Sequence, residues 1–234
     1  CRGSWGMQMK KLISPEPDKV ALVDVPEPEI GPDDVLVRSV RSLISTGSEL
    51  KRVKRVVGQT DQTWPNHDLG YATCGEVIEC GESVERFKVG DHVATMQHHQ
   101  QIVASPTRPD VLKATIPVPD TISWDDAPFM IWGRSCWNWT MKADIAIGDT
   151  VAVMGLGLVG LLMVMWSRLR GPGRIIGIDL HDRRLEPGLK AGADEVINAS
   201  EGDLPQAVAE LNAGRGADVT VHCVSGDAVR SEER

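Results

Sequence analysis

The feature that most constrains the fold of this chain is a glycine-rich turn at residues 155–160, with the sequence G-L-G-L-V-G. It follows the apolar stretch 150–154, which predicts a buried strand, and it opens an apolar helix at residues 158–170. In such a turn the first glycine permits a tight bend, the second lets backbone amides approach a pyrophosphate, and the third lets the helix pack on its strand. The helix N-terminus then offers free N–H groups to the phosphates. The turn therefore predicts a dinucleotide site whose contact residues are Gly155, Gly157, Leu158, Val159 and Gly160.

An acidic residue lies where such a site needs one. Residues 174–179 predict a second strand, which ends in Asp179, 24 residues after Gly155. A carboxylate there accepts hydrogen bonds from the ribose hydroxyls and repels a 2′-phosphate, so NAD is favoured over NADP. Arg183 and Arg184 follow the acid. An arginine there can accommodate a 2′-phosphate, although the solvated start of a helix explains both residues as well; Arg184 is kept as a candidate cofactor contact.

The rest of this half alternates helices and strands, which predicts a parallel sheet covered on both faces. The predicted helices are residues 184–191 and 204–212, and the predicted strands are residues 195–198 and 219–224.

The first 120 or so residues are rich in short predicted strands. Apolar runs bounded by Gly and Pro predict them at residues 19–25, 35–44, 72–79, 92–96, 101–104 and 116–118. This spacing is typical of a small barrel or sandwich. Ser123 and Asp126 then resemble a capping box, which predicts a helix from there to about Met141, with Pro128 distorting its first turns.

Composition excludes several classes of function. The formal net charge is −8, from 25 Lys and Arg against 33 Asp and Glu. This argues against nucleic acid or an anionic membrane as the main partner, because both need a basic surface. Glycines interrupt the longest apolar stretch, so no membrane-spanning helix is expected. The five cysteines show no C-x-x-C spacing and no signal peptide is evident, so we expect a reducing, cytoplasmic location without a disulfide framework.

Several blocks of this sequence resemble the medium-chain dehydrogenase/reductase superfamily, in its zinc-type alcohol dehydrogenase branch and zinc-free relatives. These blocks are residues 20–25, 31–37, 75–81, 87–93, 148–160, 191–197 and 214–218. The resemblance implies an α/β plus β architecture with the active site in a cleft between two domains. A GroES-like β-barrel domain at 7–122 and a linking helix region at 123–148 would precede a partial Rossmann doubly wound parallel sheet at 149–234. Such a sheet has six strands, and the last segment supplies about four, so we expect a fragment or a truncated product.

The family's zinc ligands are not matched. The first ligand is the Cys of a C-G-[ST]-D run, which here begins with Thr46; the second is the His of a G-H-E-x-x-G run, which here is Tyr71. The third falls near Met130. Because Zn²⁺ takes thiolate, imidazole or carboxylate ligands, we expect no catalytic metal. His98 and His99 (and His67 nearby) could still bind some metal, although adjacent histidines on a short loop are more often solvated.

Without zinc, the alkoxide that develops during hydride transfer needs another stabilising group. Tyr71 occupies a ligand position and Ser48 the family's proton-relay position, so we predict that Tyr71 is a hydrogen-bond donor or general acid with Ser48 as its partner. The alternative is that Tyr71 only fills the space of the metal. The resemblance also implies a supporting role for Glu49, and it places Val224 and Ser225 along the ribose and nicotinamide of the cofactor.

These expectations combine into an NAD(H)-dependent, zinc-independent oxidoreductase that acts on a small alcohol or carbonyl compound, or on an activated alkene. A homo-oligomer stays open. The alternative is a non-catalytic dinucleotide-binding protein, or an inactive fragment of such an enzyme, in which the loss of the ligands marks the loss of chemistry.

Overall fold

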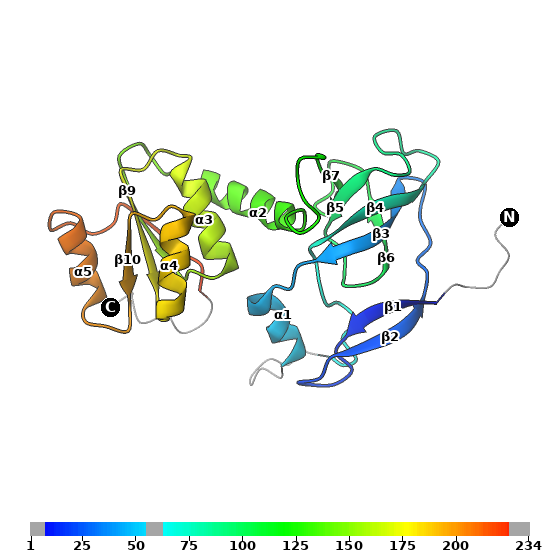
Figure 1. Cartoon of the computed structure of the whole chain (residues 1–234), viewed down its shortest axis with the longest axis horizontal. Coiled ribbons are helices and arrows are strands. Elements are labelled where there is room, and N and C mark those ends of the chain that lie inside the picture. The colour runs from blue at the N-terminus through cyan, green and yellow to red at the C-terminus, as the bar shows by residue number, and fades with distance from the viewer. Residues whose placement is uncertain (1–7, 55–62, 225–234) are drawn as a thin grey trace. The chain divides into compact units, whose positions relative to one another are not determined.

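The structure is a computed structural model that describes residues 8–54 and 63–224 (Figure 1). The chain divides into two compact units, Cys1–Ile131 and Trp132–Arg234, and the division falls inside helix α2 (Phe129–Lys142). Within the described residues, no helix is long and apolar enough to cross a membrane. The linking helix region that the sequence analysis places at 123–148 stays a prediction.

The first unit is built on an antiparallel sheet with the strand order β6-β3-β4-β5-β7. A separate two-stranded sheet pairs β1 with β2. The strands are β1 (Gln8–Ile13), β2 (Ala21–Pro26), β3 (Asp34–Ser42), β4 (Thr73–Cys80), β5 (His92–Thr95), β6 (Ile102–Pro106) and β7 (Ile116–Pro117). Valines on one face of the larger sheet close over Phe87 to form the core of this unit. The six predicted strands are confirmed, each within a few residues of its expected limits.

Two elements of this unit were not predicted, β1 and the helix α1 (Thr46–Val53). In β1, Lys10 and Lys11 interrupt the apolar alternation by which a strand is recognised. Helix α1 has only eight residues, and Gly47 lies in its first turn, so its intrinsic helix propensity is low. Both elements depend on contacts with distant parts of the chain.

The predicted start of helix α2 near Ser123 was wrong. The Asp126 N–H does donate to Ser123 Oγ at 3.1 Å, as in a capping box, but this bond closes only a turn. Helix α2 begins at Phe129, directly after Pro128, because proline lacks the N–H that an interior helical position needs. The Asp125 carboxylate accepts a bond from Arg41 Nε at 2.8 Å.

The second unit is a parallel sheet with helices on both faces. Its strands follow the order β10-β9-β8-β11, and its elements are β8 (Thr150–Met154), α3 (Leu158–Arg168), β9 (Arg174–Asp179), α4 (Asp182–Ala191), β10 (Glu195–Asn198), α5 (Leu204–Leu211) and β11 (Val219–His222). Alternate strand residues face opposite ways. Val151, Val153 and Ile175 pack toward α3 and α4, whereas Ala152 and Ile176 pack toward α5. The predicted alternation of strands and helices is confirmed.

The strand order marks one end of β8 as a binding position. Strand β8 lies between β9, which follows it in the chain, and β11, which returns to its other side. The winding of the sheet therefore reverses at β8. Doubly wound sheets bind ligands outside the carboxyl ends of their strands at such a reversal. The glycine-rich turn lies at this end of β8, and the Rossmann-type arrangement expected from the sequence is confirmed.

Candidate functional site

Each glycine of the turn after β8 has its own structural reason. Gly155 has φ +91°, a conformation that side-chain-bearing residues rarely adopt. A Cβ on Gly160 would lie 1.8 Å from the Gly155 carbonyl oxygen, so only glycine lets α3 approach the turn. A Cβ on Gly157 would meet nothing within 4 Å. Packing therefore requires the first and third glycines, whereas the second borders open space.

The start of α3 presents backbone donors to this open space. Gly157 is the N-cap of α3, no side chain caps the helix there, and its first turn carries no acidic residue. Leu158 and Val159, the first helical residues, are half-buried. The first N–H groups of a helix have no partner within it, and the helix dipole adds positive potential there. This end of α3 is therefore suited to an anion such as a pyrophosphate.

Asp179 ends β9 beside the turn, and its side chain is 3% exposed. Its Oδ2 accepts the Leu156 N–H at 2.8 Å, and its Oδ1 accepts the His181 N–H at 3.0 Å. Burial disfavours the charged form, but these two bonds and the Arg184 guanidinium outweigh burial, so the pKa of Asp179 lies below its usual value. The carboxylate thus stays ionised and holds the turn through its bond to the Leu156 amide, a role that the sequence did not predict.

Arg184 lies close enough to modify the charge at this position. Its Nη1 is 3.2 Å from Asp179 Oδ2, and its side chain is 41% exposed. A carboxylate has about four acceptor positions, and three donors occupy Asp179 here, two of them on Oδ2. Oδ1 therefore keeps capacity for a further donor.

The structure also brings the end of β11 to the turn. Cys223 donates its N–H to the Met154 carbonyl oxygen at 2.8 Å. A Cβ on Gly155 would come within 2.5 Å of Val224 Cγ1, so Val224 borders the turn; its predicted place along the cofactor stays a prediction. Ser225, the other residue predicted for this side of the cofactor, lies outside the described residues.

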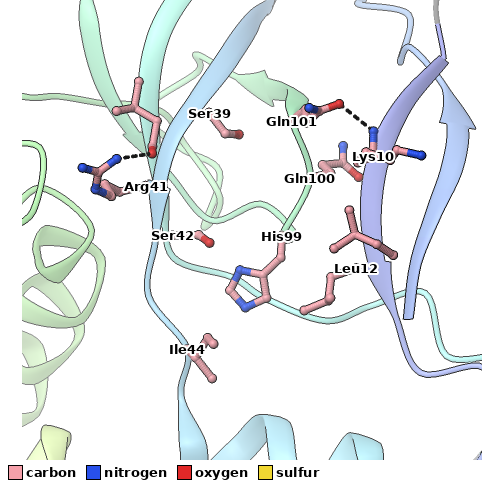
Figure 2. A pocket seen from close by; sticks show the side chains of 11 residues that line it. Lys10, Leu12, Ser39, Arg41, Ser42, Ile44, His99, Gln100 and Gln101 are labelled. Carbon is pink, nitrogen blue, oxygen red and sulfur yellow. Dashed lines mark hydrogen bonds between the residues drawn. The ribbon is translucent and has the colours of Figure 1, made fainter. Parts of the chain in front are cut away.

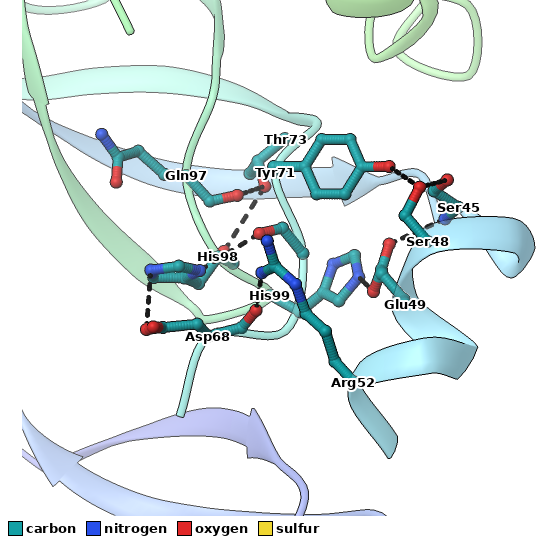
Figure 3. A network of polar contacts seen from close by, with 11 residues as sticks. Ser45, Ser48, Glu49, Arg52, Asp68, Tyr71, Thr73, Gln97, His98 and His99 are labelled. Atoms are coloured by element: carbon teal, nitrogen blue, oxygen red, sulfur yellow. Dashed lines mark hydrogen bonds and ion pairs between the residues drawn. The ribbon is translucent and has the colours of Figure 1, made fainter. Parts of the chain in front are cut away.

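A second group of predicted residues meets in the first unit (Figure 3). The Tyr71 hydroxyl donates to Ser48 Oγ at 2.9 Å, and Ser48 Oγ is 3.2 Å from Ser45 Oγ. Ser48 is exposed and Tyr71 is half-buried. The Arg52 guanidinium carbon lies 6.0 Å from the centroid of the Tyr71 ring. The predicted contact between Tyr71 and Ser48 is therefore present, and an exposed hydroxyl pair can donate to a substrate oxygen.

A buried acid–imidazole pair lies beneath this hydroxyl pair. His99 Nε2 is 2.8 Å from Glu49 Oε2, and both side chains are 7% exposed. The adjacent His98 places Nδ1 3.1 Å from the Gly70 carbonyl oxygen and Nε2 3.4 Å from Asp68 Oδ1. Adjacent histidines on a short loop were expected to be solvated more often than not. For His99 this expectation was wrong, because its side chain is buried and paired with Glu49. The pairing could not be predicted from the sequence, because 50 residues separate its members.

Each of the two units contains a region that matches a known protein family. Residues 31–109 match the family described as alcohol dehydrogenase GroES-like domain, and residues 159–232 match that described as zinc-binding dehydrogenase. The sorbitol dehydrogenase of Bacillus subtilis is 28% identical over 90% of this chain and 67% of its own length. An alcohol dehydrogenase of Cupriavidus necator is 28% identical over 94% of this chain and 71% of its own length. The fold is shared with alcohol dehydrogenase TADH from Thermus sp. ATN1, with a TM-score of 0.79, 23% identity, and coverage of 95% of this chain and 72% of that one.

The chain belongs to the medium-chain dehydrogenase/reductase superfamily. Its relatives are dehydrogenases, so the chain is an oxidoreductase enzyme with a nicotinamide cofactor and a small-molecule substrate. The chain spans about two thirds of the length of the relatives it matches.

The residues at the superfamily's zinc positions do not fit the metal. Thr46, Tyr71 and Met130 offer a hydroxyl, a phenol and a thioether, none of which is a usual Zn²⁺ ligand. In the described part of the chain, no group of three or more His, Cys, Asp and Glu side chains could hold a metal ion. The chemistry of this donor set gives no step that runs through zinc.

His99 also lines a cavity of about 390 Å³ (Figure 2). Leu12, Ser42 and Ile44 surround the imidazole ring in this view, and Arg41 and Lys10 lie at the rim. Lys10 Nζ is paired with Asp24 at 2.7 Å, and Arg41 is paired with Asp125. Because carboxylates already pair with these cations, the cavity has little net attraction for an anionic substrate.

Proposed function

We propose that this chain is an NAD(H)-dependent dehydrogenase or reductase that acts on a small alcohol or carbonyl compound, or on an activated alkene, without catalytic zinc. The bound nicotinamide supplies or accepts the hydride. The observation that carries the proposal is the turn after β8, in which Gly157 borders open space at the uncapped start of α3. Glycines that packing requires flank this opening, so the turn holds its shape around a pyrophosphate.

The preference for NAD rests on Asp179. Its carboxylate is ionised and keeps acceptor capacity on Oδ1, which suits a ribose hydroxyl and disfavours a 2′-phosphate. Arg184 weakens this preference, because its guanidinium neutralises part of the charge and is exposed enough to turn toward a phosphate.

Titration with NADH and NADPH tests the cofactor preference. Tryptophan fluorescence reports binding, and circular dichroism first confirms that the protein is folded. We expect NADH to bind at least tenfold more tightly, which is about 1.4 kcal/mol. Preference for NADPH would show that Arg184 outweighs Asp179, and a folded protein that binds neither would contradict dinucleotide binding.

We assign the role of proton donor to Tyr71. Its hydroxyl donates to Ser48 Oγ, and Ser48 is exposed. During carbonyl reduction, the phenol turns its one hydroxyl hydrogen from Ser48 to the developing alkoxide and then transfers that proton, while the Ser48 hydroxyl donates to the phenolic oxygen and orients it. The Arg52 guanidinium lies over the Tyr71 ring and restricts where the ring can move.

Tyr71→Phe tests this assignment, because it removes the hydroxyl and keeps the ring. We expect kcat to fall by about 10²–10⁴-fold while NADH binding is unchanged. EDTA should leave the turnover of the wild-type protein unaffected, and loss of activity that Zn²⁺ restores would contradict the zinc-free proposal. Wild-type rates in Tyr71→Phe would show that the ring only fills the space at this position.

One observation favours a second candidate, a dinucleotide-binding protein without catalysis. All three zinc positions carry residues that zinc does not use, as expected where catalysis has been lost. Turnover of any carbonyl, alcohol or alkene substrate with NADH oxidation or NAD reduction would exclude this candidate. A cytoplasmic location and a homo-oligomer stay predictions.

A further inference from the structure

The proposed acid pair depends on a helix that is weak by itself. Ser48 lies in the first turn of α1, and Arg52 lies one turn later on the same face, toward the Tyr71 ring. An isolated helix of eight residues is unstable in water. The Ser45 side chain, which could cap α1, makes no capping hydrogen bond. Something outside the helix must therefore hold Ser48 at its 2.9 Å contact with Tyr71.

Glu49 supplies that connection. It is the one buried residue of α1, at 5% exposure, and its Oε1 accepts the Ser45 N–H at 2.7 Å, which closes the start of the helix. Its Oε2 contacts His99 Nε2. Because an ionised carboxylate only accepts hydrogen bonds, the imidazole carries a hydrogen on Nε2 and donates a hydrogen bond to Glu49.

His99 is in turn held by the segment that carries Tyr71. Its N–H donates to the Leu69 carbonyl oxygen at 2.9 Å, and its carbonyl oxygen accepts the Leu12 N–H of β1 at 2.9 Å. The ring lies directly against Gly70, where a Cβ would come within 2.7 Å of His99 Cγ. Gly70 precedes Tyr71 in the chain. A continuous set of contacts therefore joins the backbone that positions the phenol to the helix that positions its partner (Figure 3).

We propose that the buried pair of Glu49 and His99 positions the two hydroxyls of Tyr71 and Ser48 for proton transfer. The catalytic part of this inference rests on the proposed role of Tyr71, whereas the positioning part does not. Neither Glu49 nor His99 touches the reacting atoms. They act by fixing α1 against residues 69–71, so that Ser48 and Tyr71 meet before a substrate arrives. Small displacements of catalytic groups have large effects on rate, so such support matters.

The chain contains a single tyrosine, so one NMR signal reports the environment of Tyr71. We would incorporate 3-fluorotyrosine and compare the ¹⁹F spectra of the wild type, His99→Leu and His99→Gln. Leucine cannot donate to Glu49, whereas the glutamine amide can. His92→Leu is the matched control, because the His92 ring packs on Trp124, with ring centroids 4.3 Å apart, and His92 is not part of the set of contacts described above. Each variant is also assayed for kcat and for the KM of NADH.

We expect His99→Leu to shift or broaden the Tyr71 signal and to lower kcat by about tenfold or more, with the KM of NADH unchanged. His99→Gln should restore most of the signal and the rate, and His92→Leu should change neither. An unchanged Tyr71 signal in His99→Leu would overturn the positioning role. A moved signal with an unchanged kcat would support positioning and would instead contradict the proposed acid role of Tyr71.

Glu49→Gln covers the case in which His99→Leu does not fold. It keeps an acceptor for the Ser45 N–H and nearly the same volume, but it replaces the carboxylate that orders the imidazole. We expect a smaller displacement of the Tyr71 signal in this variant. A signal identical to that of the wild type would overturn the inference.

Discussion

Two alanine substitutions in the turn after β8 separate its folding from its binding. At Gly157 the backbone has φ −79° and ψ −167°, which alanine adopts freely, and a Cβ there meets nothing within 4 Å. Alanine restricts the unfolded chain, which stabilises by about 0.4–1 kcal/mol, but it is a poorer N-cap than glycine by a similar amount. Gly157→Ala should therefore change the free energy of unfolding by less than about 0.5 kcal/mol.

The same methyl group lies where the amides must approach a pyrophosphate. We expect Gly157→Ala to weaken NADH binding by at least about tenfold, or 1.4 kcal/mol, with the fold intact. Gly160→Ala is the contrasting variant. Its Cβ would lie 1.8 Å from the Gly155 carbonyl oxygen, so the backbone must move, and overpacking of this kind costs about 1–3 kcal/mol or more.

Urea unfolding gives the stabilities, and a fluorescence titration with NADH gives the affinities. Wild-type NADH affinity in a folded Gly157→Ala would refute the assignment of the open space to the pyrophosphate. Wild-type stability in Gly160→Ala would refute the packing argument for the third glycine. The two results are independent, because one concerns the ligand and the other the protein alone.

Three further predictions concern side chains of the second unit. The pKa of Asp179 is held below its usual value, so its ionised carboxylate contributes stability above about pH 4 that is lost as the pH falls through the lowered pKa. Asp179→Asn should flatten this part of the stability curve in urea unfolding between about pH 3 and 6, and an unchanged slope would contradict the argument. Arg184→Ala removes the cation beside Asp179 and should weaken NADPH binding relative to NADH; an unchanged ratio of the two affinities would show that Arg184 does not contact the cofactor. Burial raises the pKa of Cys223 to about 11 and that of Cys136 to about 12, so iodoacetamide at about pH 8 should modify neither until urea unfolds the protein, as peptide mass spectrometry would show.

The second unit could be predicted almost residue by residue because its signals are local. The strand residues 150–154 are all buried, and the helix that follows begins at a glycine turn with few alternatives. Around the glycine turn, the part that was not predicted concerns Asp179. Its position was predicted, but its hydrogen bonds to the Leu156 and His181 amides were not, because they depend on how the turn folds back over the end of β9.

A supporting role for Glu49 was expected from the resemblance, but its pairing with His99 could not be predicted, for a physical reason. Tyr71, Ser48 and Glu49 were found because family motifs assign those positions, and no such motif includes His99. The contact between Glu49 and His99 spans 50 positions and forms only when β1 and residues 69–70 close around the imidazole. No neighbouring residue in the sequence indicates that Glu49 and His99 pair. Two adjacent histidines are first interpreted as a metal site or as part of a solvated loop. Residues that position catalytic groups therefore emerge from tertiary structure, and here the chain's only tyrosine makes them measurable.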